Sequence, residues 1–265
     1  MLVAITRLYT ALVLAVFVLL TGCITEETRG DGQPVAEATK VSKTAALDDY
    51  ITLANGYMKE GKREKSLRAI NKGLELDPDS AAMLNVLAYY YSTDGEDKLS
   101  EKEYKRAISS DSTYTASYLN YGTFLFRQKR YDEACDMFAK ATEDVMYGKR
   151  DAAFLNYGIC LKQQGKMKEA EEAFRRSYVN DARNPLVVLE LAQLKFDTGD
   201  FDQSLQLYNK FLGMSKQNSR SLWLGIRLMH VMGHDDKEAG YAMFLKNEFP
   251  ASTEYNEYKV WSESK

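Results

Sequence analysis

The chain has 265 residues, 45% of them hydrophobic, and its 35 basic and 38 acidic side chains leave a net charge of −3. This length allows one extended domain or two compact ones, and the hydrophobic content is enough for a core. So small a charge gives no reason to expect binding to nucleic acid or to an anionic membrane face. Three cysteines exclude a disulfide-dense scaffold, and two histidines leave little material for a metal site. Only four prolines, with abundant Ala, Leu, Glu and Lys, favour helices.

Residues 1–22 have the features of an export signal. Arg7 precedes an apolar stretch over residues 8–20 that is too short to span a membrane comfortably. The following Leu20-Thr21-Gly22-Cys23 resembles the lipobox of bacterial lipoproteins, in which two small residues precede the cysteine that receives a diacylglycerol. A signal helix that merely ends in cysteine is the alternative. We expect cleavage before Cys23 and an acyl anchor on its thiol, which is the one cofactor-like group predicted.

Two features bear on where the anchored protein resides. Ile24 follows Cys23 at the place where lipoproteins retained in the inner membrane usually carry aspartate, so the outer membrane is the expected destination. Residues 24–46 have no helical apolar period and no aromatic residue. Range 23–46 is therefore predicted to be a lipidated N-terminus with a flexible tether, with the folded part facing the periplasm.

The remainder of the chain is self-similar. Segments 118–141 and 154–177 match almost residue for residue at a spacing of 36, and segment 186–211 follows with a spacing of 34. Leu53-Ala54 and Leu87-Ala88 show the same spacing of 34 near the start, and segment 222–250 is a degenerate sixth copy. A period of this length is the mark of a repeat architecture built from helical hairpins.

These copies resemble tetratricopeptide repeats. Small residues recur in the first helix (Ala54, Ala88, Gly122, Gly158, Ala192) and in the second (Ser66, Ser100, Ala134, Ala170, Ser204). Bulky residues follow four places later (Ile70, Tyr104, Phe138, Phe174, Tyr208), and Pro78 and Pro250 close the first and last units. Small residues let the two helices approach closely, and the bulky ones fill the wedge between hairpins. The expected turns hold Gly61, Gly95, Lys129, Gly165, Gly199 and Gly233, a place where glycine suits a left-handed cap.

The resemblance implies an all-α, right-handed solenoid of about six repeats over residues 47–250. The units are expected near 47–80, 81–114, 115–150, 151–184, 185–218 and 219–250. Residues 251–265 are predicted to form a capping helix and tail, in which Tyr255, Tyr258 and Trp261 cover the end of the stack.

Motifs for chemistry fail on inspection. Gly56 and Gly61-Lys62 imitate a phosphate-binding loop, but Arg63 replaces the Ser or Thr that would hold Mg²⁺, and no strand precedes it. His230 and His234 are four apart, yet Gly233 marks a turn between them and no glutamate is placed for a zinc hydrolase. No nucleophile, base and orienting group can be assembled. We therefore expect a protein that is not an enzyme, with no metal and no small-molecule substrate.

Cys135 and Cys160 fall in helices that are neighbours in this architecture. An oxidising periplasm permits a disulfide between them, which would clamp two units together. The alternative is that both are small buried residues. The sequence leaves both open.

A solenoid without a catalytic set offers its concave surface to an extended peptide or a partner helix. Asn120 and Asn156, in twin "LNYG" copies, are the foremost candidates, because asparagine at this place commonly hydrogen-bonds the ligand backbone in tetratricopeptide domains. An asparagine that satisfies local backbone groups is the alternative. The other predicted contributors are Asn55, Met58, Asn85, Tyr89, Phe126, Arg127, Gln193, Phe196 and Arg227. Amides, methionine and aromatics suit a partly apolar peptide.

Taken together, lipobox, tether and repeats are similar to the outer-membrane lipoproteins of type IV pilus biogenesis, the PilF/PilW family. Segment 221–255 carries the resemblance, with "LWLGIR" at its start and "FP-x-S-x-E-Y" at its end. The similarity extends over essentially the whole chain. Leu119 departs from the family, where a second asparagine is common.

The resemblance implies a pilotin. Such a monomer binds a pilus secretin subunit, promotes its outer-membrane localisation, multimerisation and stability, and so supports pilus formation and twitching motility. The alternative is a periplasmic scaffold or adaptor for cell-envelope enzymes that uses the same groove.

Overall fold

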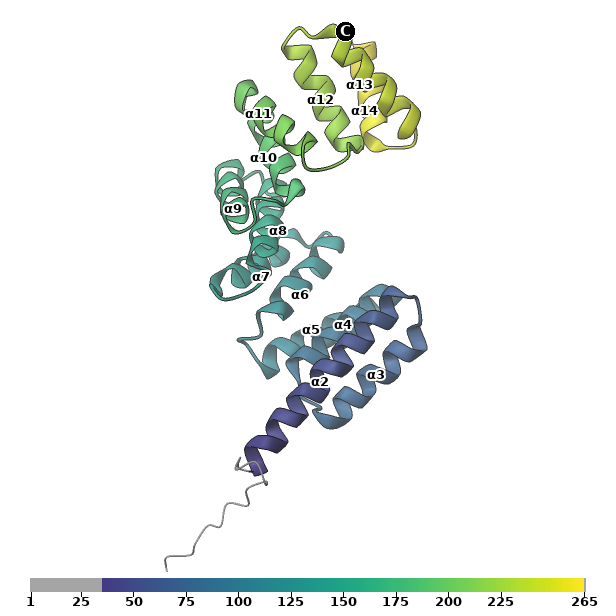
Figure 1. The fold of residues 1–265 in the computed structure, drawn as a ribbon, viewed down its shortest axis with the longest axis vertical. Coiled ribbons are helices and arrows are strands. Elements are labelled where there is room, and N and C mark those ends of the chain that lie inside the picture. Colours follow the sequence, from purple (N-terminus) through teal and green to yellow (C-terminus); the bar gives the residue numbers. More distant parts are fainter. Residues whose placement is uncertain (1–34, 265) are drawn as a thin grey trace, which may run out of the picture. The chain divides into compact units, whose positions relative to one another are not determined.

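The computed structural model describes residues 35–264, with side-chain surroundings from residue 42 onward. This part of the chain folds into thirteen helices and no strands (Figure 1). The chain divides into two compact units, Met1–Pro78 and Asp79–Lys265. None of the described helices is both long enough and apolar enough to cross a membrane.

The first unit contains one helical hairpin, α2 (Val35–Lys59) and α3 (Arg63–Leu76). Its two helices meet where the Ser66 hydroxyl donates a hydrogen bond of 3.0 Å to the Ala54 carbonyl oxygen. Helix α2 begins at Val35, well inside the range expected to be a tether, so that expectation is wrong for residues 35–46. The physical reason is that these twelve residues, with four Ala and two Lys, contain no glycine or proline to interrupt the helix. The rest of the expected tether, and Cys23, lie outside the described residues.

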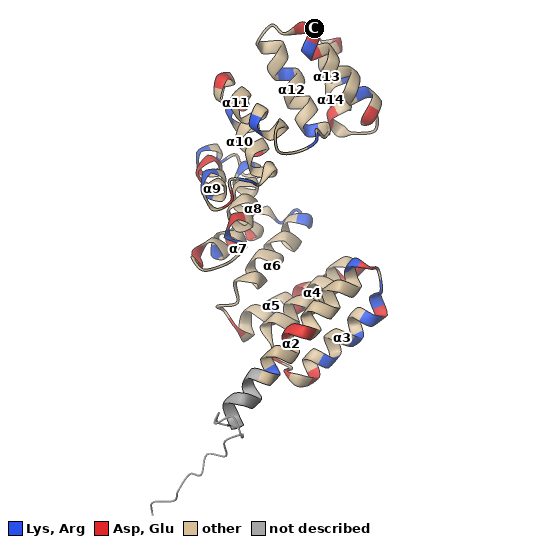
Figure 2. Ribbon diagram, in the orientation of Figure 1, with Lys and Arg blue, Asp and Glu red and all other residues tan. Residues whose placement is uncertain are grey.

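The second unit contains five more hairpins and a final helix (Figure 1). The hairpins are α4 (Ala81–Asp94) with α5 (Asp97–Ser110), α6 (Thr115–Arg127) with α7 (Tyr131–Glu143), α8 (Arg150–Gln163) with α9 (Met167–Asn180), α10 (Pro185–Asp197) with α11 (Phe201–Leu212), and α12 (Ser219–Val231) with α13 (Asp235–Glu248). Thus the degenerate sixth copy is a complete hairpin, and the predicted all-α array of tetratricopeptide-like units is confirmed. Figure 2 shows few charged residues on α4 and α6, whereas α3 carries several.

The turns inside the hairpins have the backbone conformation that the sequence predicted. The five turn glycines have φ values between 70° and 81°. Lys129 takes the same place in the third hairpin with φ 61°, and no other described residue apart from glycine has a positive φ. A left-handed residue ends the first helix and reverses the chain within a few residues, which sets the hairpin geometry locally.

The two helices of a hairpin pack closely because small residues lie opposite each other on the first and second helices. Ser100 and Ser204 donate hydrogen bonds of 2.9 and 2.7 Å to the carbonyl oxygens of Ala88 and Ala192. At Gly158, a Cβ atom would lie 2.5 Å from the Phe174 ring, so the aromatic side chain occupies the space that glycine leaves. The bulky residue therefore packs against the small residue of its own hairpin, in addition to filling the wedge between hairpins.

Helix α14 (Thr253–Glu263) closes the second unit as predicted. Its Tyr258 and Trp261 rings lie 6.2 and 5.5 Å from the ring of Trp223 on α12, both edge to face. Tyr255 belongs to the same cluster. This aromatic contact covers apolar surface that a seventh hairpin would otherwise bury.

Candidate functional site

The first helices of successive hairpins in the second unit carry a row of polar and aromatic side chains, which we call the A-helix face. It is defined by Asn120 on α6, Asn156 on α8, Glu190 on α10 and Arg227 on α12, together with the side chains that contact them. The row exists because equivalent places recur in successive hairpins: Asn156 follows Asn120 by 36 residues and Glu190 follows Asn156 by 34, while Arg227 follows Gln193 by 34.

At the α4–α6 end, the structure joins predicted residues across the hairpins. The Asn120 Nδ2 atom donates to Asn85 Oδ1 at 3.2 Å, and Arg127 donates to the Ser92 hydroxyl at 3.3 Å. Asn85 is only 5% exposed, so the expectation that it offers its side chain to a partner is wrong. The Asn85 Oδ1 atom accepts the hydrogen bond from Asn120. The Oδ1 atom of Asn120 itself stays available to accept from a ligand.

Asn156 is in a different situation from Asn120. It is half-buried, and its amide group makes no hydrogen bond within the part of the chain that the structure describes. An amide offers both a donor pair and an acceptor, which matches the alternating groups of a peptide backbone. Of the two asparagines, Asn156 therefore has the freer hydrogen-bonding capacity.

Aromatic candidates differ in how accessible they are. Tyr89 on α4 is 44% exposed. Phe126 is half-buried because its ring packs edge to face against Tyr131 at 5.0 Å. In the first unit, Asn55 and Met58 lie half-buried on α2, one and four residues after Ala54.

At the C-terminal end of the A-helix face, three predicted residues meet. Arg227 donates to Gln193 Oε1 at 2.7 Å, and its guanidinium lies 4.7 Å from the ring centroid of Phe196. The same guanidinium lies 5.0 Å from the ring of Trp223. Burial lowers the pKa of Arg227, and the carboxylates of Asp197 and Glu257 oppose that effect. The result is a positive charge held close to two aromatic rings.

Sequence reasoning missed Glu190, which lies on the same face. Its side chain is 2% exposed and accepts from Lys162 Nζ at 2.7 Å and from Arg220 at 2.5 Å. Burial would raise the pKa of this carboxyl, but the two cations outweigh burial and hold the pKa below its usual value. Glu190 follows Asn156 by 34 residues, so the repeat register alone could have found it.

A disulfide joins Cys135 on α7 to Cys160 on α8, with their Cα atoms 5.6 Å apart. Of the two alternatives that the sequence left open, the structure has the bridge. It connects the second helix of the third hairpin to the first helix of the fourth, the helix that carries Asn156. Both cysteines are at most 5% exposed, so the bond lies within the packed interior.

The residues of the rejected phosphate-loop and histidine motifs lie in turns and in packing contacts of the hairpins. His230 contacts Glu238 at 3.1 Å and the Trp261 ring at 5.0 Å, and His234 precedes α13. Lys62 pairs with Glu60 at the α2–α3 turn. Within residues 35–264, His, Cys, Asp and Glu form no group of three suited to a metal ion.

Known proteins similar to this chain share both its repeats and its length. The tetratricopeptide repeat pattern matches residues 51–115 and 114–178. The type IV pilus assembly protein PilF of Pseudomonas aeruginosa is 38% identical over 250 residues, which cover 94% of this chain and 97% of that protein. The chain belongs to the PilF family of type IV pilus assembly proteins.

Solved structures agree with membership of the PilF family. A structure of Pseudomonas aeruginosa PilF matches with a TM-score of 0.77 and 37% identity, over 83% of this chain and 99% of that one. PilW, described as a widely conserved type IV pilus biogenesis factor, matches with a TM-score of 0.69 and 26% identity, over 80% and 97% of the two chains. As a PilF-family protein, the chain is a non-enzymatic tetratricopeptide protein of type IV pilus biogenesis that acts through protein–protein interaction in the cell envelope.

Proposed function

We propose that this protein is an outer-membrane lipoprotein that binds a pilus secretin subunit and promotes the subunit's localisation, multimerisation and stability. The lipid on Cys23 supplies the address, and the A-helix face holds a segment of the subunit until contacts within the secretin ring replace it. The observation that carries the proposal is the 38% identity to PilF over almost the full length of both chains. The lipobox and Ile24 support the outer-membrane destination.

The A-helix face supports binding of an extended segment. The unengaged amide of Asn156 and the free carbonyl oxygen of Asn120 can pair with a peptide backbone, which gives affinity with little dependence on sequence. Arg227 with Phe196 provides a cationic and aromatic platform at the other end. Because the disulfide ties α7 to α8, the two asparagines keep their relative position before binding, which lowers the entropy cost of association.

Deletion of the gene should have the largest effect on the secretin, so it is the first test of the proposed function. In membrane extracts loaded without heating, the secretin multimer should disappear from the gel, while the monomer remains. An unchanged multimer would overturn the proposed function. Normal pili together with a cell-wall defect would instead favour a scaffold for envelope enzymes.

Two substitutions test the lipid anchor and the binding surface separately. Cys23→Ser should move both this protein and the secretin away from the outer membrane in fractionated cells, because the anchor is lost. Asn156→Ala should weaken capture of the purified secretin subunit about tenfold, as expected for loss of hydrogen bonds to a peptide. Its thermal midpoint should stay near that of Asn247→Ala, a matched change at an exposed asparagine on α13. A large fall in the midpoint would show that Asn156 is structural.

A further inference from the structure

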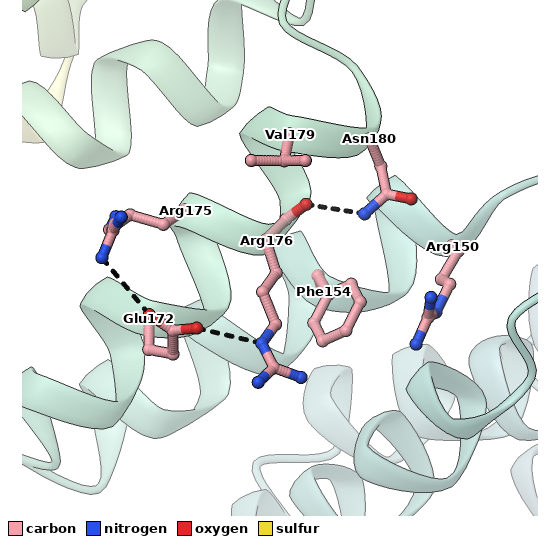
Figure 3. A pocket seen from close by; sticks show the side chains of 7 residues that line it. All are labelled: Arg150, Phe154, Glu172, Arg175, Arg176, Val179 and Asn180. Atoms are coloured by element: carbon pink, nitrogen blue, oxygen red, sulfur yellow. Dashed lines mark hydrogen bonds and ion pairs between the residues drawn. The ribbon is translucent and has the colours of Figure 1, made fainter.

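A second polar site lies on α8 and α9, away from the A-helix face. A hollow of about 230 Å³ is lined by Arg150 and Arg176, which lie on either side of Phe154, and by Arg175 beyond Glu172 (Figure 3). Phe154 and Asn156 are two residues apart on one helix, which turns them roughly 200° apart around its axis. A ligand in this hollow therefore does not compete with one on the A-helix face.

Arg150 and Arg176 are held in place through their Nε atoms and the Phe154 ring, so their terminal nitrogens remain available as donors. The Arg150 guanidinium lies 5.2 Å from the Phe154 ring centroid, and its Nε atom donates to the Thr142 carbonyl oxygen at 3.0 Å. The Arg176 guanidinium lies 5.7 Å from the same centroid, and its Nε donates to Glu172 Oε1 at 3.0 Å. The terminal nitrogens of both make no hydrogen bond or ion pair with any residue between 35 and 264. Two oriented pairs of donors are thus ready for an anion.

Charge around the hollow is not balanced. Three arginines and one carboxylate, Glu172, line the hollow, and Glu172 pairs with Arg175 at 3.6 Å and with Arg176 at 3.0 Å. The lining residues therefore carry a net charge of +2, since three positive charges meet one negative charge. Like charges held near one ring repel each other, and a bound carboxylate would relieve that repulsion.

The space beside the arginines is partly apolar. An adjoining hollow of about 390 Å³ shares Phe154, Glu172 and Arg176. Tyr157, Leu161 and Ala173 also line it, together with the oppositely charged Lys168 and Glu169. Val179 stands at the rim of the first hollow and is 83% exposed. A free phosphate or a lipid headgroup would engage the arginines and leave this apolar space unfilled. An acidic residue followed by a hydrophobic one fits both hollows.

We propose that this site docks an acidic, partly hydrophobic segment of a protein partner. A side-chain carboxylate accepts from the terminal nitrogens of Arg150 and Arg176, and a neighbouring apolar side chain enters the hollow beside Tyr157 and Leu161. The proposal is independent of the secretin-binding role, because it uses the opposite side of α8. It makes the protein an adaptor with two faces.

Fluorescence anisotropy with the mature lipoprotein in zwitterionic detergent tests the proposal. The probe is a labelled eight-residue peptide that alternates glutamate with leucine, and its control replaces each glutamate with glutamine. The glutamate peptide should bind at least about tenfold more tightly, since each charge-assisted hydrogen bond is worth roughly that factor. Equal binding of the two peptides would overturn the proposal.

Variants locate the site. Arg150→Gln with Arg176→Gln should weaken binding of the glutamate peptide at least about tenfold. The control is Arg183→Gln. The side chain of Arg183 is 97% exposed and lies outside the hollow, so this change should alter the affinity less than about twofold. Arg150→Lys with Arg176→Lys keeps the charge and removes the planar fork, so its affinity should be intermediate. Undiminished binding by the double Gln variant, with a wild-type thermal midpoint, would overturn the proposal.

Titration with glycerol 1-phosphate separates a peptide from a phospholipid headgroup. Weaker binding than the glutamate peptide, with no displacement of that peptide at equal concentration, supports the assignment. Tighter binding that the double Gln variant abolishes would assign the site to a headgroup and overturn the peptide proposal.

Discussion

The contacts from α8 to its two neighbours use different chemistry, although the two residues that make them are only two positions apart near the end of this helix. Toward α7, Cys160 forms a covalent bond with Cys135. Toward α10, Lys162 forms an ion pair of 2.7 Å with the buried Glu190. The covalent link persists at any pH and yields only to reduction, whereas the ionic link depends on charge and on exclusion of water. Nearly identical repeats can therefore be joined by unlike interactions, each with its own vulnerability.

Removing the covalent link should have the largest effect. We expect Cys135→Ala with Cys160→Ala to lower the free energy of unfolding by about 3.5 kcal/mol, because a bridge that spans 25 residues restricts the unfolded chain. Urea denaturation of the oxidised protein, the reduced protein and the double variant measures this. If reduction leaves the urea midpoint unchanged, the bridge does not hold the third and fourth hairpins together.

Breaking the ionic link should cost somewhat less. Glu190→Ala leaves Lys162 and Arg220 without their shared partner at a buried place, and we expect a loss of about 3 kcal/mol. The same denaturation series measures it, with Glu172→Ala as control, because the side chain of Glu172 is 53% exposed and its ion pairs are solvated. Equal losses in the two variants would show that the buried ion pair of Glu190 stabilises the fold no more than the exposed ion pairs of Glu172 do.

A third link, between α5 and the residue that precedes α7, should respond to acid. Glu101 accepts from Arg130 at 2.8 Å, from Lys105 at 2.7 Å and from the Tyr121 hydroxyl at 3.0 Å. The hydrogen bond from Arg130 is the main cause that lowers the pKa of Glu101 to about 2. Because this pKa is depressed in the folded state, the stabilisation is full above about pH 4.5 and is lost as the pH falls toward 2.

Acid titration of stability measures that contribution. Allowing for solvent screening, we expect it to be about 2 kcal/mol between pH 5 and pH 2. In Glu101→Gln this part of the pH dependence should vanish, while the disulfide contribution stays the same at both pH values. An identical acid profile in the variant and the wild type would assign the acid sensitivity to other carboxylates.

The smallest effect concerns contacts inside one hairpin. Ser204→Ala removes the hydroxyl that donates 2.7 Å to the Ala192 carbonyl oxygen, and we expect a loss of about 1 kcal/mol in thermal or urea denaturation. Ser109→Ala, at an exposed place on α5, should change stability by less than about 0.5 kcal/mol. A loss at Ser204 as large as that of the bridge would mean that contacts within hairpins, rather than between them, limit stability.

Much of the fold was predictable because its determinants are local and repeated. The place of Lys129 in a left-handed turn followed from the register of the glycines in the other hairpins. The start of α2 was wrongly predicted, because residues 35–46 lack an apolar period but still favour a helix through their backbone propensities. Glu190 was not predicted although it shares the register of Asn156, because no spacing in the sequence shows that Lys162 and Arg220 from the neighbouring hairpins meet its carboxylate.

The sequence by itself determined the period, the hairpins, the turns and the small residues at each close approach, since those depend on steric constraints within a few residues or on repetition. Only the tertiary structure decided which side chains meet between hairpins: Asn85 with Asn120, Glu190 with Lys162, and Cys135 with Cys160 at 5.6 Å between Cα atoms. Those contacts depend on the distance and rotation between packed helices, which no spacing in the sequence specifies.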